Sequence, residues 1–530
     1  MQDAVLVQMN SRGEDSQDVW GMLTISLVRL WWVQEVCSGV NGHIKEYLPL
    51  GRVGALILCI GFASHGWTRE FDDPWHVMQS VSASPAQPMI NGGSVEGVCP
   101  ERPLSVPLGI FEAVERSLCS NPKTKGAWAD VKASAEAVGV AKAAYLPTLN
   151  GSVQYIGEHI GSQIINQPSL DSPHNEHVGT QTLSLNWVLF DFGGRSANLD
   201  SAKKLLAAAQ ASQNVALQTA YINAAKDYYA AVSGLSRVQA MQRVENDAHD
   251  SFMAASQRME GGAATVTDRL QSKTAYTMAE YNRVKAEATF RSALGSLAVD
   301  MGLAPDVLIT LPSIHDDNPR APKFITSIHE LIEEAERQHP TVLEAQAQWE
   351  SAQAKVRSIQ SEGLPTISLV AESSRNNQPT SVQLGSPELP AVTRDNYLGI
   401  KLDVPLFEGQ ARGYKVRQAQ AQADSQREAM HDAEHQVATA IWSNYQDLLA
   451  NGQNLDITHD ALEAAQQAFI VMQTRYKSGM ANILELLNTQ EALAKAEEQH
   501  VEAQTDWYTS KLQLAASLGN IDLVSASTYE

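Results

Sequence analysis

Two short motifs in this sequence carry residue types that could do chemistry. Residues 431–435 read His-Asp-Ala-Glu-His and match the His-x-x-Glu-His pattern of one class of zinc proteases. On a helix, this spacing puts His431 and His435 on one face, as zinc binding requires. The motif, however, lies midway along a long polar helical pattern, and residues 214–218, its counterpart 217 positions earlier, contain no histidine. We therefore predict no zinc site, and a metallohydrolase is the least supported hypothesis for this chain.

The second motif, Asp191-Phe192-Gly193, spells the magnesium-binding motif of protein kinases. Neither a kinase catalytic loop nor a Gly-rich loop accompanies it in the sequence. The motif falls instead where a predicted strand ends. The sequence thus predicts a protein that is not an enzyme and that uses no cofactor.

The composition narrows the class of protein further. The chain has 530 residues, with 39 Lys plus Arg against 60 Asp plus Glu and a net charge of −21, whereas binding to nucleic-acid phosphates needs a basic surface. Only 6% of the residues are aromatic, and such a composition is typical of long helices. All four cysteines lie within the first 119 residues, which excludes a disulfide scaffold for the remainder. After residue 100 no apolar run is long enough for a transmembrane helix.

Residues 1–106 differ from the rest and are interpreted as a signal-like segment followed by a loose lead-in. Residues 53–63 form an apolar run that is too short to span a bilayer but is typical of a signal-peptide core. Because such a core belongs near the start of a chain, we expect translation to begin in the 40s or early 50s. The alternative is an uncleaved membrane-proximal segment that includes residues 23–33. Several prolines between residues 85 and 107 indicate the loose lead-in.

The body of the chain consists of two repeats of one structural unit. Leu146-Pro147-Thr148 recurs 218 residues later, and Leu189-Phe190-Asp191 recurs 217 residues later as Leu406-Phe407-Glu408. The two repeats span residues 107–303 and 325–519, with a Pro-rich linker at 304–324 and a tail at 520–530. Further pairs at the 217 offset are Arg195 and Arg412, Tyr228 and Tyr445, Arg258 and Arg475, Gly262 and Gly479, and Gly302 and Gly519.

Within each repeat the period of the hydrophobic pattern changes twice. Two helices are predicted on either side of Asn121-Pro122 and of His339-Pro340, because the residue before a proline avoids the helical region. Alternating patterns then predict strands at about 148–157, 180–190, 366–374 and 396–407. Each strand pair leads into a helix of about 63 residues, roughly 95 Å long, that turns back near Gly262 or Gly479.

Strands with one apolar and one polar face need a partner for the apolar face. Ten tilted residues are enough to cross a bilayer as a barrel strand, and in lipid the sheet must close. Four strands cannot enclose a lumen, so several chains must contribute to one barrel. The alternative is a soluble coiled-coil scaffold with a small β cap, whose apolar face would be its core.

The repeated motifs resemble those of the TolC family of outer-membrane channels. The resemblance includes the Asn-Pro or His-Pro helix joint, the Leu-Pro-Thr strand entry, the Leu-Phe-Asp/Glu strand exit followed by arginine, and Arg475-Tyr476-x-x-Gly479. It covers about residues 107–519. The stretch Leu118-Cys119-x-Asn121-Pro122 is most similar to the type I secretion subgroup, which includes exporters of adenylate cyclase-haemolysin toxin.

The resemblance implies a mainly α-helical protein with a membrane β-barrel. Three chains would form a twelve-stranded barrel in the outer membrane, above a periplasmic α-helical barrel. The protein would be a passive duct that carries a protein toxin or small molecules. Its partners would be two sister chains, a periplasmic membrane-fusion adaptor, an inner-membrane ABC transporter or proton-driven pump, and outer-membrane lipid, with no nucleic acid.

Candidate site residues follow from the same pattern. Asp268 and Glu485, each six residues beyond a tip glycine, could ring the periplasmic aperture, where the family carries acids and Asn488 departs from that rule. The alternative is that Asp268 and Glu485 are ordinary solvated acids on the helix surface. The tips, predicted to dock the adaptor, are Gly262, Ala263, Gly479 and Met480. The predicted lumen-facing residues are Ser184, Asn186, Lys401 and Asp403. The predicted lipid-facing residues are Leu183, Leu185, Trp187, Leu398, Ile400 and Leu402.

Overall fold

The structure is a computed structural model of the chain. It describes residues 73–88, 99, 103–160, 165, 174–312, 327–378, 389 and 391–519. The chain divides into two compact units, residues 1–74 and 75–530, and the helices and strands of the described residues belong to the second unit. The predicted signal core at 53–63 and the tail at 520–530 lie outside the described residues.

Each repeat opens with two helices that meet at the predicted proline joint. In the first repeat these are α4 (Ile110–Ser120) and α5 (Pro122–Ala143), and in the second they are α8 (Ile328–Gln338) and α9 (Pro340–Ser361). The Asn121 side chain accepts a hydrogen bond from the Lys123 N–H at 2.9 Å and so caps α5. His339 Nδ1 does the same for α9, accepting from the Thr341 N–H at 3.2 Å. The prediction of paired helices is confirmed.

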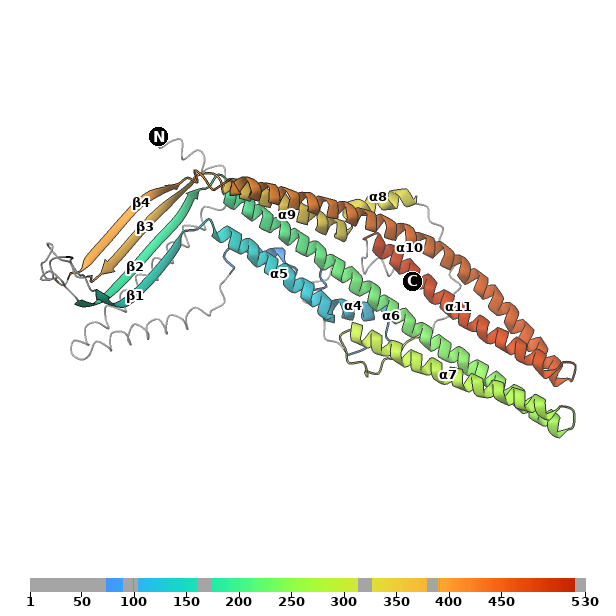
Figure 1. The fold of residues 1–530 in the computed structure, drawn as a ribbon. Coiled ribbons are helices and arrows are strands. Elements are labelled where there is room, and N and C mark those ends of the chain that lie inside the picture. The colour runs from blue at the N-terminus through green and yellow to red at the C-terminus, as the bar shows by residue number, and fades with distance from the viewer. Residues whose placement is uncertain are drawn as a thin grey trace. The chain divides into compact units, whose positions relative to one another are not determined.

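Four antiparallel strands form one sheet in the order β1-β2-β3-β4 (Figure 1). They are β1 (Thr148–Ile160), β2 (His174–Phe190), β3 (Thr366–Asn376) and β4 (Thr393–Asp403). The pairing of β2 with β3 joins the two repeats. Among the described residues, the outer edges of β1 and β4 have no strand partner. An unpaired edge is a surface to which another strand can be added.

The strand boundaries differ most from the prediction at the start of β2 and at the end of β4. β2 begins at His174 rather than near residue 180, because its polar first residues still pair with β1, as in His159 with Asn175. β4 ends at Asp403, so the prediction that it reaches residue 407 is wrong. Pro405 has no N–H to donate to a ladder, and β3 offers no partner beyond Thr366, which pairs with Asp403.

Two long helical hairpins follow the strands (Figure 1). The first consists of α6 (Gly194–Glu260) and α7 (Val266–Asp300), and the second of α10 (Ala411–Lys477) and α11 (Ile483–Ser517). The 67 residues of α6 extend about 100 Å. The hairpins contact each other through α6 and α11. Alanines dominate the buried positions of α6, so its neighbours can pack closely.

Residues 75–88 pack against the helices, although the sequence predicts a loose lead-in there. Trp128 Nε1 donates to the Ser82 carbonyl at 2.9 Å, and Gln213 Nε2 donates to the Pro85 carbonyl at 3.0 Å. Ala86 is fully buried against α6. The 3₁₀ helix η1 (Val77–Ser80) lies in the same stretch. We call residues 75–88 the strap, because they are held on α5 and α6 by side chains of those helices.

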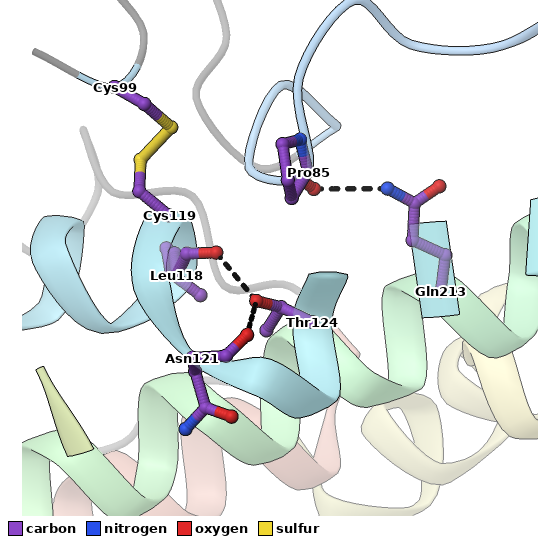
Figure 2. Close-up of a disulfide and its surroundings, with 7 residues drawn as sticks. All are labelled: Pro85, Cys99, Leu118, Cys119, Asn121, Thr124 and Gln213. Carbon is purple, nitrogen blue, oxygen red and sulfur yellow. Dashed lines mark hydrogen bonds between the residues drawn. A yellow bond between two sulfur atoms is a disulfide. The ribbon is translucent and has the colours of Figure 1, made fainter. Parts of the chain in front are cut away.

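A disulfide joins Cys99 to Cys119 near the end of α4 (Figure 2). One turn further on, the Thr124 hydroxyl lies within hydrogen-bonding distance of the Leu118 and Asn121 carbonyls, at 2.9 and 2.8 Å. The proline joint of the first repeat is therefore tied both covalently and by hydrogen bonds. This disulfide was not predicted from the sequence; the signal for it was two cysteines 20 residues apart in a chain with an expected export signal.

Replacing Cys119 by serine should lower the free energy of unfolding by about 3 kcal/mol, because the disulfide closes a loop of 20 residues in the unfolded chain. Urea unfolding followed by the helical circular dichroism signal measures the loss. The parent chain treated with a reducing agent is the matched control and should reproduce the serine variant. An unchanged unfolding midpoint in both samples would contradict the prediction.

Part of the predicted linker packs against the first repeat. The Leu108 N–H donates to the Thr310 carbonyl at 2.8 Å, and Leu311 is buried beside Leu108. Residues 313–324 of the linker lie outside the described residues. Across the part of the chain that the structure describes, none of the helices combines the length and the apolarity needed to cross a bilayer.

Candidate functional site at the hairpin tips and strand faces

Both long hairpins turn with the same backbone geometry. At the first tip the Ala263 N–H donates to the Arg258 carbonyl at 2.7 Å, and at the second the Met480 N–H donates to the Arg475 carbonyl at 2.8 Å. Gly262 and Gly479 adopt positive φ values of 73° and 80°. This is the usual glycine termination of a helix. The four predicted tip residues therefore form two equivalent turns, with Met480 exposed on the second.

The two predicted aperture acids occupy the same position in their helices. The Asp268 carboxylate accepts the Thr265 N–H at 2.9 Å while the Asp268 N–H donates to Thr265 Oγ1 at 3.2 Å. The Glu485 N–H donates to Asn482 Oδ1 at 2.9 Å, and the Asn482 amide donates back to Glu485 at 3.0 Å. Thr265 and Asn482 thus cap the helices that return from the tips; the Asp268 carboxylate completes a capping box with Thr265, and the Glu485 carboxylate holds the side chain of Asn482. The sequence signals for this role are the spacings Thr-x-x-Asp and Asn-x-x-Glu, which were not recognised as caps.

Arg258 connects the two tips within the chain. Its Nη1 donates to the Tyr476 carbonyl at 2.7 Å, and its guanidinium lies 4.7 Å from the centre of the Tyr476 ring. Its repeat counterpart Arg475 is exposed and has no side-chain hydrogen bond or ion pair with the described residues. In the sequence both arginines serve only as family markers, and this contact was not predicted because it depends on how the hairpins pack.

Tyr476 is the residue on which the tip contacts converge. It is 2% exposed and belongs to a cluster that includes Ala255 of the first hairpin and Ile483 of the second. Burial raises the pKa of the Tyr476 phenol; the nearby Arg258 charge lowers it and the Asp268 charge raises it. Asn488, the third predicted aperture residue, is exposed one turn beyond Glu485.

Charged pairs continue along the seam between α6 and α11. Arg243 lies 3.4 Å from the buried carboxylate of Glu497, and Arg237 pairs with Glu498. Burial raises the pKa of Glu497, although the Arg243 charge lowers it. The two hairpins of one chain are therefore joined by ion pairs as well as by alanine packing.

The strand register places each predicted set of side chains on one face of the sheet. Leu185 is opposite Ala371, and Leu369 is opposite both Trp187 and Ile400. Residues opposite one another share a face. The face that carries the predicted lipid-facing set holds Leu183, Leu185, Trp187, Leu398, Ile400 and Leu402. The other face holds Ser184, Asn186, Lys401 and Asp403.

Exposure and pairing differ among these residues. Leu398, Ile400 and Leu402 are exposed, whereas Trp187 is half-buried and donates from its indole to the Tyr145 carbonyl at 2.9 Å. Lys401 forms an ion pair with Asp403 at 3.0 Å. With respect to the described residues, the β4 part of the apolar face is thus exposed, and on the polar face the charges of Lys401 and Asp403 pair with each other.

Within the Asp-Phe-Gly and His-x-x-Glu-His motifs, the side chains of Asp191 and His431 make local contacts among the described residues. Asp191 accepts the Arg195 N–H at 2.7 Å where β2 turns into α6, with Phe192 and Gly193 at positive φ. His431 lies 2.9 Å from Glu434 on the surface of α10. No group of three metal-ligating side chains occurs among the described residues.

Comparison with known proteins places this geometry in a family. Residues 113–302 and 331–520 match the family described as Outer membrane efflux protein. Protein CyaE of Bordetella pertussis is 27% identical over 78% of this chain and 84% of its own length. Outer membrane protein TolC of Escherichia coli is 21% identical over 82% of this chain and 86% of its own length. The solved structure of VceC from Vibrio cholerae superposes with a TM-score of 0.64 at 19% identity, covering 78% of this chain and 96% of VceC.

These matches define a duplicated outer-membrane export channel with a periplasmic helical part. Because the family match covers both repeats, the chain belongs to the Outer membrane efflux protein family. The predicted TolC-like fold and channel function are confirmed, and the alternative of a soluble coiled-coil scaffold is not supported.

Proposed function

We propose that three copies of this chain form one passive duct through the outer membrane, without catalysis. The observation that carries the proposal is a sheet of four strands that, among the described residues, has exposed apolar side chains on one face and two unpaired edges. Three such sheets, joined from β4 to β1 of the next copy, would close a twelve-stranded barrel and pair every edge. Purified protein should need detergent, run as a heat-modifiable trimer and conduct ions in planar bilayers. A stable monomer in plain buffer would overturn the assembly.

The resemblance to type I secretion channels supports the choice of partners and cargo. A periplasmic adaptor would dock on the turns around Gly262-Ala263 and Gly479-Met480, where the exposed Met480 side chain offers an apolar contact. The energy would come from an inner-membrane ABC transporter or a proton-driven pump. The similarity of Leu118-Cys119-x-Asn121-Pro122 to the secretion subgroup favours a protein cargo over a small molecule.

The periplasmic aperture would be lined by Asp268, Glu485 and Asn488. These hydrogen bonds use one carboxylate oxygen of Asp268 and one of Glu485, and the negative charge of each acid remains. A threefold assembly would bring three copies of each acid to the narrow end, and a ring of acids favours cations. Asn488 makes this ring less charged than a strictly acidic one.

Glu485→Gln should reduce the cation preference of single channels. One carboxylate about 10 Å from a permeating cation in water attracts the cation by ~0.4 kcal/mol. Three carboxylates therefore contribute ~1.2 kcal/mol, which corresponds to about an eightfold change in the cation-to-anion permeability ratio. Glutamine keeps the carbonyl oxygen that accepts from Asn482, so the helix cap survives. Glu502→Gln, at an exposed position far along the same helix, is the matched control. Unchanged cation selectivity in Glu485→Gln would show that Glu485 does not line the aperture.

A further inference from the structure

A pocket of about 360 Å³ lies between the two repeats of the chain. One wall comes from α6 residues between Val215 and Lys226, and the opposite wall includes Gln513, Ala516 and Ser517 of α11. Across it, Gln218 Nε2 donates to the Gly519 carbonyl at 3.0 Å. In this pocket the end of α11 in the second repeat packs against α6 of the first repeat.

A second pocket, of about 610 Å³, has the same design with one wall missing. Its lining includes Asp227, Ser296, Val299 and Asp300. Adding 217 to each number gives Asn444, Gln513, Ala516 and Ser517, which all line the first pocket. The α6 wall has no equivalent here among the described residues of the chain. Its repeat counterpart is the stretch 432–443 of α10, where the residues that correspond to the lining are exposed.

At and just beyond that stretch, the surface of α10 exposes the apolar side chains of Trp442 and Leu449. Trp442 is 51% exposed, whereas its counterpart Ala225 is fully buried. Leu449 is 43% exposed, whereas its counterpart Val232 is 3% exposed. Positions that the first repeat buries inside the chain are therefore open in the second repeat. The same helix face is buried in the first repeat and exposed in the second, which indicates that a further helix covers this face of the second repeat.

We propose that α10 of a second copy of this chain completes the pocket, with His435 of that copy taking the place of Gln218. His435 of the second copy then donates to the Gly302 carbonyl, as Gln218 donates to the Gly519 carbonyl. The imidazole enters beside Asp227 and Asp300. This inference rests on the proposed assembly of three copies and names the residue contact that holds neighbouring copies together.

The charges in the pocket fit an imidazole at this position. Among the described residues, neither Asp227 nor Asp300 has a side-chain hydrogen bond or ion pair, and burial together with the charge of Asp300 raises the pKa of Asp227. Arg291, which also lines the pocket, lies 3.8 Å from Glu287. Burial raises the pKa of Asp300, although the charge of Lys123 already acts on Asp300 and lowers it. A helix that covered the pocket without bringing a cation or donor would still leave Asp227 buried and unpaired. His435 supplies that group.

A cross-linking experiment on the full chain in detergent tests the contact. In a chain whose Cys37 and Cys59 are replaced by serine, we expect the variant with His435→Cys and Val299→Cys to give covalent dimers and trimers with a bismaleimide short enough to span the pocket, and each single variant to give none. The pair Gln218→Cys and Ala516→Cys, its repeat counterpart, is the control and should cross-link within one chain. Trimers that form without the cross-link between positions 435 and 299 would overturn the proposed contact, while the proposal of a trimeric duct would stand. A protein that stays monomeric overturns the assembly itself.

Charge substitutions supply a second test that does not depend on cysteine chemistry. His435→Asp puts a third carboxylate beside Asp227 and Asp300 and should lower the trimer fraction at least tenfold, with the helical content of the monomer unchanged. His435→Gln recreates the side chain of Gln218 and should keep the trimer. Equal trimer fractions in the two variants would overturn the proposed position of His435.

Discussion

Ile400→Lys should abolish assembly of the protein in the outer membrane. Ile400 is 74% exposed in β4, and Leu398 and Leu402 flank it on the same face. If this face meets lipid, a lysine near the bilayer midplane costs about 2–4 kcal/mol per chain, or ~6–12 kcal/mol for three chains. The measurement is the heat-modifiable trimer band after detergent extraction of the outer membrane, together with urea unfolding from lipid vesicles.

Gly399→Lys is the matched control for this substitution. Gly399 is the preceding residue of the same strand, points to the opposite face, and has no atom within 4 Å of a Cβ added to it. A lysine there would join Lys401 on the polar face and should leave the trimer intact. Equal tolerance of both lysines would contradict a lipid-facing sheet. Loss of the trimer only in Gly399→Lys would show that the two faces are reversed.

The fold could be predicted from the sequence because its signals are periodic and appear twice. The alternation of Leu183 and Leu185 with Ser184 and Asn186 indicated a two-faced strand, and the register confirms that each set shares a face. The joint at His339-Pro340 was predicted because proline restricts the residue before it. The second copy of each motif, 217 residues away, provides an independent check of the first.

Features that depend on contacts between distant segments could not be predicted in this way. The strap has no periodic pattern, and its order comes from side chains such as Gln213, 128 residues further along the chain than Pro85. The extent of β2 was underestimated because its first residues are polar and are held by pairing with β1. Local propensity does not reveal such partners.

Some features of the candidate site could likewise be predicted from the sequence, and others depend on contacts between distant segments. The equivalence of Asp268 and Glu485 was predicted from the offset, whereas their contacts with the capping residues Thr265 and Asn482 were missed although the spacings Thr-x-x-Asp and Asn-x-x-Glu indicate them. The bridge from Arg258 to Tyr476 was out of reach, because the repeat counterpart Arg475 makes no such contact with the described residues. Identical residue types in the two repeats therefore make different contacts, because Arg258 lies where the two hairpins of the chain meet and Arg475 does not.

Gly302→Ala should lower the free energy of unfolding by about 4 kcal/mol. Gly302 follows α7 at φ 73°, and a Cβ there would lie 2.8 Å from Ser120 Cβ and 3.2 Å from the Ser120 carbonyl oxygen. The left-handed backbone costs a non-glycine residue about 1–2 kcal/mol, and overpacking adds about 1–3 kcal/mol. The contact holds the end of the first hairpin against the last residue of α4, so relief would require those helices to separate. Urea unfolding followed by circular dichroism measures the loss.

Gly262→Ala separates the two contributions to this cost. Gly262 has the same φ of 73°, but nothing lies within 4 Å of an added Cβ at the hairpin tip. This variant should therefore show only the backbone term, about 1–2 kcal/mol. The difference between the variants measures how tightly α7 is held against Ser120. Equal losses would contradict the close approach, and the conformation of the glycine alone would then explain both.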